Sequence, residues 1–210
     1  MTRGGAVGRR YAEAWLPEDP VLLAARARAE EQGIEPLGPG AGATLAFLAT
    51  VTSARAVIEI GTGTGVSGTW LLRGMRPDGV LTSIDTRGDH QQAARQTFRE
   101  AGFPTPRTRL IAGQALQVMP RLSDGAYDLV FCSAGASETA DYVEEAVRLL
   151  RTGGVIAIDN ALWGDRVADP SARDPETVAV REVGRAVRDD PRLVPALLPI
   201  GDGMIVAVKL

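Results

Sequence analysis

Apolar positions along the chain follow two patterns. Short runs rich in β-branched residues predict buried strands, and longer segments with apolar residues every three to four positions predict amphipathic helices. The predicted strands cover residues 56–60, 80–84, 108–111, 127–132, 154–158, 193–200 and 204–208. The predicted helices cover residues 11–16, 20–31, 43–51, 66–75, 89–101, 115–122, 139–151 and 175–188.

Strands and helices alternate from residue 56 onward, which predicts an α/β fold. Near-continuous apolar strands separated by amphipathic helices indicate a parallel sheet covered on both faces. The end of the chain differs, because two apolar runs are joined by Gly201-Asp202-Gly203, a pattern typical of a hairpin. We therefore expect a seven-stranded, mostly parallel sheet whose last strand is antiparallel.

The composition limits the available chemistry. The 210 residues carry 26 acidic and 23 basic side chains, a net charge of -3, with a single histidine, His90, and a single cysteine, Cys132. These counts exclude zinc fingers, Cys/His metal cages, CxxC redox motifs and disulfide scaffolds. A mildly acidic chain with dispersed positive charge argues against nucleic acid or an anionic membrane as a partner. We expect small molecules or a second copy of the chain instead.

The N-terminal region indicates a cytoplasmic protein. Residues 1–10 include basic side chains, but no apolar stretch follows, so no signal peptide is expected. Apolar runs such as residues 56–60 are far shorter than the roughly 20 residues that span a bilayer. We divide the chain into an N-terminal helical segment, residues 1–33, and one domain, residues 34–210.

Three alternating glycines, Gly61, Gly63 and Gly65, follow the first predicted strand and precede a helix. Glycines let the backbone turn sharply and approach a ligand, and a helix N-terminus offers unpaired N–H groups. The alternative is a tight turn without a ligand, but three alternating glycines exceed what a turn needs. The pattern predicts a cofactor site at the carboxyl end of the first strand.

Two cofactor classes compete for this loop. Residues 63–68 match the dinucleotide pattern GxGxxG, but counted from Gly61 the third glycine position falls on Val66. With Glu59 two residues before Gly61, the loop instead matches the first motif of class I S-adenosylmethionine-dependent methyltransferases. Asp85, which ends the second strand, would hold ribose hydroxyls in either class. Helices ahead of the first strand and a terminal hairpin favour S-adenosylmethionine.

From about residue 34 to residue 210 the sequence resembles the small O-methyltransferases of the catechol and caffeoyl-CoA type, particularly their bacterial members. The matching stretches are residues 57–65, 81–85, 127–131, 149–154, 159–160 with 163–164, and 199–203. The resemblance implies a Rossmann-like class I methyltransferase fold, S-adenosylmethionine as cofactor and methyl transfer to a hydroxyl oxygen of a small aromatic acceptor. A homodimer is also expected.

The resemblance implies a set of cofactor-binding residues. They are Leu37, Glu59, Gly61, Thr62, Gly63, Gly65, Ser67, Asp85, Gly113, Gln114, Ala115 and Ser133. Asp85 would bind the ribose hydroxyls, residues 113–115 would lie along the edge of the adenine, and Leu37 would close over the cofactor. We expect His90 to be a solvated surface histidine. Tyr11 and Trp15 would cap the active site or pack against a dimer partner.

The family's chemistry uses a divalent cation, usually magnesium, that coordinates two substrate oxygens and lowers the pKa of the attacking hydroxyl. Relatives supply an aspartate after the fourth strand and an Asp-Asn pair after the fifth. Asp159 and Asn160 preserve the pair. Ser133, however, stands where the first carboxylate belongs, and Ala136 where some relatives place a catalytic lysine.

Three interpretations follow from this altered motif. Magnesium binds weakly through Asp159, Asn160 and water; or the enzyme works without metal, with Asp159 as base or orienting group; or the protein binds its cofactor without catalysis. We rank the metal-independent enzyme first, because Ser133 and Ala136 have changed together. Methyl transfer to nitrogen or sulfur is a narrower alternative.

Overall fold

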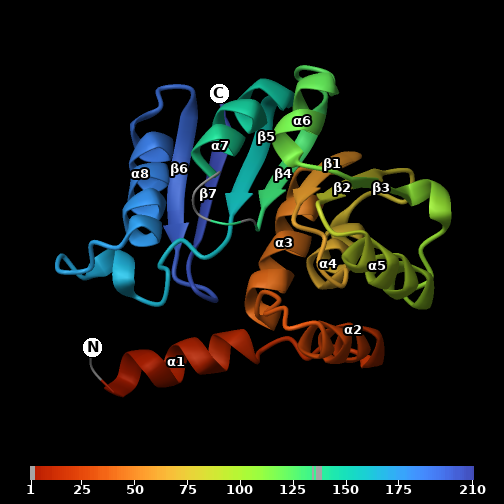
Figure 1. Ribbon diagram of the computed structural model, residues 1–210, viewed down its shortest axis with the longest axis horizontal. Coiled ribbons are helices and arrows are strands. Elements are labelled where there is room, and N and C mark those ends of the chain that lie inside the picture. Colours follow the sequence, from red (N-terminus) through yellow and green to blue (C-terminus); the bar gives the residue numbers. More distant parts are fainter. Residues whose placement is uncertain (1–2, 134, 136–138) are drawn as a thin grey trace.

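The computed structural model describes residues 3–133, 135 and 139–210. Within these residues the chain builds a seven-stranded sheet with strand order β3-β2-β1-β4-β5-β7-β6 (Figure 1). The strands are β1 (Ala56–Ile60), β2 (Val80–Asp85), β3 (Thr108–Ala112), β4 (Tyr127–Cys132), β5 (Leu150–Ile158), β6 (Leu193–Leu198) and β7 (Met204–Lys209). β7 pairs antiparallel with β5 and β6, and the other pairings are parallel. The predicted sheet and terminal hairpin are confirmed.

Helices precede the sheet and connect its strands. They are α1 (Arg3–Glu13), α2 (Pro20–Glu31), α3 (Pro39–Val51), α4 (Val66–Gly74), α5 (Gly88–Glu100), α6 (Ala115–Val118), α7 (Thr139–Leu149) and α8 (Pro175–Asp189), with short 3-10 turns η1 (Thr105–Arg107), η2 (Met119–Arg121) and η4 (Arg166–Ala168). In the described part of the chain, none of the helices is both long and apolar enough to cross a membrane.

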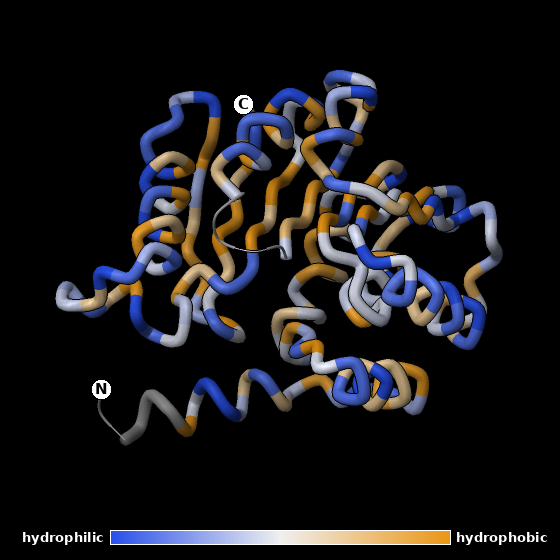
Figure 2. Tube along the Cα trace, viewed as in Figure 1, coloured by the Kyte–Doolittle hydropathy of each residue, from blue (hydrophilic) through white to orange (hydrophobic). Residues whose placement is uncertain are grey.

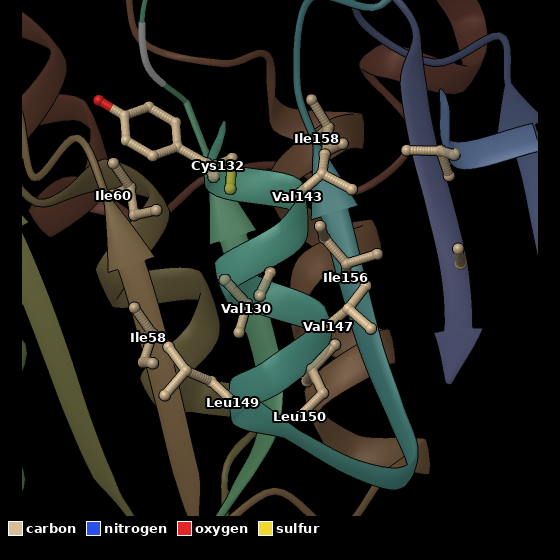
Figure 3. Close-up of a cluster of buried hydrophobic side chains, with 14 of the residues drawn as sticks. Ile58, Ile60, Val130, Cys132, Val143, Val147, Leu149, Leu150, Ile156 and Ile158 are labelled. Carbon is tan, nitrogen blue, oxygen red and sulfur yellow. The ribbon is translucent and has the colours of Figure 1, made fainter. Parts of the chain in front are cut away.

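Apolar side chains cover both faces of the sheet. On one face α6, α7 and α8 pack against the strands, and Figure 3 shows Val143 and Val147 of α7 beside Val130 of β4. On the other face α3, α4 and α5 contribute residues such as Leu45 and Phe98. Figure 2 shows the resulting apolar strands between helices with polar outer sides. Because both faces are covered, the ends of the strands are where a ligand can reach the sheet.

Several element boundaries differ from the sequence prediction, among them the start of α3, which is Pro39 instead of residue 43. α1 covers Arg3–Glu13 instead of residues 11–16, since Pro17 disfavours helical backbone at the residue before it. The helix predicted over residues 115–122 changes to a 3-10 turn around Pro120, which has no N–H to donate. β5 begins directly after α7 because Leu150 pairs with Tyr127 across a register shift, and only then does the expected strand follow.

Candidate active site

The glycine loop after β1 has a backbone that other residues cannot easily adopt. Gly61, Gly63 and Gly65 have φ angles of 92°, 48° and 85°, in the left-handed region that favours glycine. A Cβ on Gly61 would lie 2.5 Å from the carbonyl oxygen of Ser133. The N–H of Ser133 in turn donates to the carbonyl of Ile60, at 2.9 Å. The loop is therefore packed directly against the segment that follows β4.

Asp85, at the end of β2, holds this loop in place. Its Oδ2 accepts the backbone N–H groups of Thr62 at 3.0 Å and Gly63 at 3.1 Å. Its Oδ1 accepts the N–H of Arg87 at 2.9 Å. A carboxylate oxygen has lone pairs for more than one donor, so Oδ1 keeps capacity for a ligand hydroxyl. The predicted ribose-binding residue is thus also the anchor of the glycine loop.

A cavity of about 160 Å³ lies over the loop. Its lining includes the predicted cofactor residues Leu37, Gly61, Thr62, Gly63, Ser67, Asp85 and Ser133. It also includes residues that the sequence analysis did not select, namely Ile34, Glu35, Pro36, Thr64, Val66 and His90. Residues from four separate segments of the chain therefore meet at the position predicted for the cofactor. We call this space the cofactor cavity.

Four other predicted cofactor residues, Gly65, Gly113, Gln114 and Ala115, do not line this cavity. Gly65 is the N-cap of α4. Gly113 adjoins the site because its N–H donates to the carbonyl of Asp85 at 2.9 Å, and Gln114 and Ala115 follow at the start of α6. Contacts of these residues with a cofactor stay a prediction.

Glu59 lies fully buried beneath the loop. Its carboxyl oxygens accept the hydroxyl groups of Ser67 and Ser83, each at 2.6 Å. Burial is the largest effect on this group and raises the pKa of Glu59 to about 7, against the opposing influence of the two serine hydroxyls. Since Ser67 lines the cofactor cavity, Glu59 acts on the cavity by orienting Ser67.

The single histidine and cysteine both lie close to the site. His90 is not a solvated surface residue, as we expected: its side chain is 13% exposed and its Nδ1 lies 3.1 Å from Oδ2 of Asp85. α5 starts so soon after Asp85 that its first turn brings His90 back over that carboxylate. Cys132 is buried among apolar residues (Figure 3), and this burial raises the pKa of its thiol to about 12. The thiol therefore stays protonated and is not a nucleophile.

A second and larger cavity, of about 750 Å³, adjoins the first. It is lined by Glu13, Glu35, Pro36, Leu37, Gly38, Pro39, Asp159, Asn160, Trp163, Gly164, Gly201 and Asp202. Residues 35–37 line both cavities and form their common wall. We call this space the acceptor cavity. Glu13 and Asp202 belong to it, although the sequence analysis assigned neither a role.

Asp159 and Asn160 follow the end of β5 and line the acceptor cavity. The N–H of Asp159 donates to the carbonyl of Cys132 at 3.0 Å, which ties this end of β5 to the end of β4. Burial, followed by the nearby carboxylates of Asp202 and Glu13, raises the pKa of Asp159 to about 6. The carboxylate is therefore ionised at neutral pH and more basic than an ordinary aspartate.

The loop after Asp159 has an unusual backbone. Asn160 and Trp163 have φ angles of 57° and 49°, and Trp163 is a bulky residue that rarely adopts this conformation. The Asp202 carboxylate accepts the N–H of Gly164 at 2.9 Å and so helps to hold the loop. Such backbone strain persists only where the surroundings enforce it, and it is frequent in binding sites.

The donors expected to hold magnesium are only partly present. Within the described residues, no group of three or more His, Cys, Asp or Glu side chains could hold a metal ion. Asp159 and Asn160 supply one carboxylate and one amide at the acceptor cavity, and Ser133 lies on the cofactor cavity. Ala136, at the family's lysine position, lies outside the described residues. The donor set is one carboxylate short of the family's, which fits magnesium poorly.

Replacing Gly61 should damage both stability and cofactor binding. Gly61→Ala places a methyl group against the Ser133 carbonyl at a φ of 92°, so we expect a loss of about 2 kcal/mol or more in the free energy of unfolding. S-adenosylhomocysteine affinity, measured by calorimetry, should fall by about tenfold or more. Gly102→Ala is the matched control, because Gly102 has a φ of 78° but no atom within 4 Å of its Cβ position. Equal effects of the two variants on affinity would contradict this view of the loop.

Buried Glu59 should make stability depend on pH. Its pKa in the folded protein is raised to about 7, so the folded state retains a proton that the unfolded chain releases at lower pH. The contribution of this group is fully present below about pH 4.5 and is lost as the pH rises through about 7, a change on the order of 3 kcal/mol. Urea unfolding at about pH 5 and pH 8 should show a smaller loss for Glu59→Gln than for wild type. An identical loss in both proteins would refute the assignment.

Three comparisons place this geometry among known proteins. Residues 23–210 match the family model described as O-methyltransferase. The chain is 52% identical over 199 residues to a Mycobacterium tuberculosis protein named "Probable O-methyltransferase", covering 95% of this chain and 89% of that protein.

A crystal structure from Corynebacterium glutamicum has a TM-score of 0.91 and 31% identity over 99% of this chain and 97% of that one. The O-methyltransferase TomG of Streptomyces achromogenes, involved in tomaymycin synthesis and solved with S-adenosylmethionine, has a TM-score of 0.87 and 26% identity over 100% of this chain and 99% of its own. The chain therefore belongs to the S-adenosylmethionine-dependent O-methyltransferase family.

Proposed function

We propose that this enzyme binds S-adenosylmethionine in the cofactor cavity and methylates a hydroxyl oxygen of a small aromatic acceptor in the acceptor cavity. The observation that supports this arrangement best is the common wall of the two cavities, residues 35–37. Because these residues line both cavities, a methyl donor in one cavity lies next to an acceptor in the other. Trp163 and the prolines of the acceptor cavity offer flat apolar surfaces to an aromatic ring.

In this proposal each predicted residue has a defined task. Gly61, Thr62, Ser67 and Ser133 contact the methionine end of the cofactor, and Asp85 accepts a ribose hydroxyl. By the family resemblance, residues 113–115 lie along the edge of the adenine, and Leu37 closes over the cofactor. Gly63 and Gly65 shape the loop, and Glu59 acts through Ser67. S-adenosylmethionine, when bound, supplies an electrophilic methyl carbon.

Asp159 is the proposed catalytic residue. Its carboxylate lines the acceptor cavity and is ionised at neutral pH, so it can accept the hydroxyl proton as the acceptor oxygen forms its bond to the methyl carbon. The electron pair of the breaking carbon–sulfur bond stays on sulfur. The protein's main contribution is to hold the acceptor oxygen in line with that bond.

We rank metal-independent transfer first because a single carboxylate, Asp159, stands where relatives supply two. Weak magnesium binding through Asp159, Asn160 and water is the alternative, and a third possibility is a protein that binds cofactor without catalysis. Transfer to nitrogen or sulfur is a narrower variant. The metal-independent, weak-magnesium and non-catalytic interpretations each predict a different activity in the presence of a chelator.

We also propose a cytoplasmic homodimer that acts on small molecules and not on nucleic acid or membranes. Residues 1–33 would cap the active site or contact the second subunit. Val7 and Tyr11 support this, because they lie four residues apart on one face of α1 and are 68% and 71% exposed. Trp15, which follows the end of α1, is 70% exposed. Large exposed apolar side chains grouped in this way are typical of an interface.

Calorimetry tests the cofactor. We expect S-adenosylhomocysteine to bind at about micromolar concentration and NAD not to bind. Asp85→Asn should weaken S-adenosylhomocysteine binding by about tenfold or more, since it removes a charged acceptor that also anchors the loop. Binding of NAD without S-adenosylhomocysteine would overturn the proposal.

Activity on a panel of phenols, including catechol, tests the role of Asp159. We expect turnover that survives EDTA, is unchanged by added magnesium and falls by about a hundredfold or more in Asp159→Asn. A strict magnesium requirement would contradict metal-independent transfer and support the weak-metal alternative. If wild type methylates no phenol despite binding S-adenosylhomocysteine, the non-catalytic alternative is favoured.

A further inference from the structure

The last residue of α1, Glu13, joins two distant parts of the chain. Its Oε2 accepts the backbone N–H of Gly40 at 2.9 Å, and its Oε1 accepts the N–H of Gly201. Gly40 lies in the first turn of α3, and Gly201 lies in the turn between β6 and β7. Figure 1 shows α1 on the outside of the molecule, beyond the end of α3 and away from the sheet. We call Glu13 with these two N–H groups the Glu13 clamp.

The surroundings of the carboxylate are built to receive it. A Cβ on Gly38 would lie 2.5 Å from Oε2 of Glu13, and one on Gly40 would lie 3.0 Å from the same atom. Gly38 is also the N-cap of α3 and has no side chain with which to cap the helix. Glu13 supplies the missing acceptor, and its negative charge is favourable at the helix N-terminus. Glycines therefore make room for a side chain that takes over a capping role.

The two groups held by the clamp belong to two rims of the acceptor cavity that pack against each other, since a Cβ on Gly40 would lie 3.0 Å from Cδ1 of Ile200 and one on Gly201 would lie 3.4 Å from Cβ of Ala41. Gly40 follows directly on Leu37, Gly38 and Pro39, which form the rim on the cofactor side. Gly201 precedes Asp202, whose carbonyl accepts the N–H of Leu162 at 2.7 Å.

The clamp also reaches the catalytic side of the cavity. The carboxylate of Asp202 accepts the N–H of Gly164, so the turn that contains Gly201 is bonded to the loop after Asp159. Glu13 thereby connects the cofactor-side rim to the rim that carries the proposed catalytic residue.

We propose that Glu13 is a positioning residue for methyl transfer, whose carboxylate locks the start of α3 and the turn between β6 and β7 in one relative position and thus fixes the place of the acceptor relative to the cofactor. This inference rests on the proposed function. Near-attack geometry is sensitive to shifts of about 1 Å, so a rim released from the clamp changes acceptor binding and turnover. Among the predicted cofactor residues only Leu37 belongs to a rim that the clamp holds, while the glycine loop and Asp85 hold most of the cofactor and the clamp does not touch them.

Hydrogen exchange of the full-length protein tests the clamp without an acceptor. Peptides that cover residues 38–42 and 199–203 report the two amides. Glu13→Ala removes both acceptors, and we expect exchange in both peptides to become about tenfold faster or more. Glu13→Gln keeps one amide oxygen and should give an intermediate result. Arg10→Gln, on an exposed position of the same helix, should match wild type. Unchanged exchange in Glu13→Ala would overturn the clamp.

Kinetics with catechol as the probe test the positioning role. We expect Glu13→Ala to raise the KM for catechol by about tenfold or more, while its affinity for S-adenosylhomocysteine stays within about threefold of wild type. Glu13→Gln should recover part of the loss. A purely structural role predicts an equal loss of catechol and S-adenosylhomocysteine binding, and either that result or an unchanged KM would overturn the positioning claim. If wild type methylates no phenol, the proposed function fails, and the exchange experiment still decides the clamp.

Discussion

The contact between the Asp85 carboxylate and the glycine loop is the interaction on which the site depends. Parallel strands bring their carboxyl ends to one edge of the sheet, so Asp85 of β2 ends beside the loop that follows β1. Its Oδ2 accepts two consecutive N–H groups, from Thr62 and Gly63, and also faces Nδ1 of His90. One charged side chain thus fixes the loop and the first turn of α5, and it does so before any ligand arrives.

A buried acid supports this arrangement from below. Glu59 is removed from water, and its hydrogen bonds to Ser67 and Ser83 offset only part of the cost of burying its charge, as its raised pKa indicates. Ser83 is also bonded to the hydroxyl of Thr62, at 2.7 Å, so the network runs from the core to the cavity wall. The unfavourable free energy of burying Glu59 occurs where backbone and hydroxyl groups are aligned toward a ligand.

The sheet, its antiparallel end and the glycine loop were predictable because their signals are local. Hydrophobic period, glycine spacing and the Gly201–Gly203 turn each lie within a few residues. The role of Glu13 was not predictable in this way, since its partners lie 27 and 188 residues away and bond through backbone N–H groups that carry no side-chain signal. His90 was misjudged for a related reason. Its exposure depends on how soon α5 begins after Asp85, and the distance of five residues between them was the available clue.

The acceptor side of the site differs from the family pattern in the number of carboxylates that could bind a metal ion. Ser133 replaces a carboxylate, while Asp159 remains in a cavity that also contains Glu13, Glu35 and Asp202. Burial, together with repulsion from Asp202 and Glu13, raises the pKa of Asp159, which suits a proton acceptor better than it suits a magnesium ligand set with one carboxylate. A cofactor side that follows the family pattern is therefore compatible with an acceptor side that differs from it.

The most direct test of this account is a crystal structure of the protein with S-adenosylhomocysteine and catechol. The account predicts the ribose on Asp85, the sulfur facing the wall shared by the two cavities, and a catechol hydroxyl within hydrogen-bonding distance of Asp159. It would be contradicted by S-adenosylhomocysteine bound away from the Gly61–Gly65 loop, or by a catechol whose oxygens lie on the far side of the acceptor cavity from Asp159.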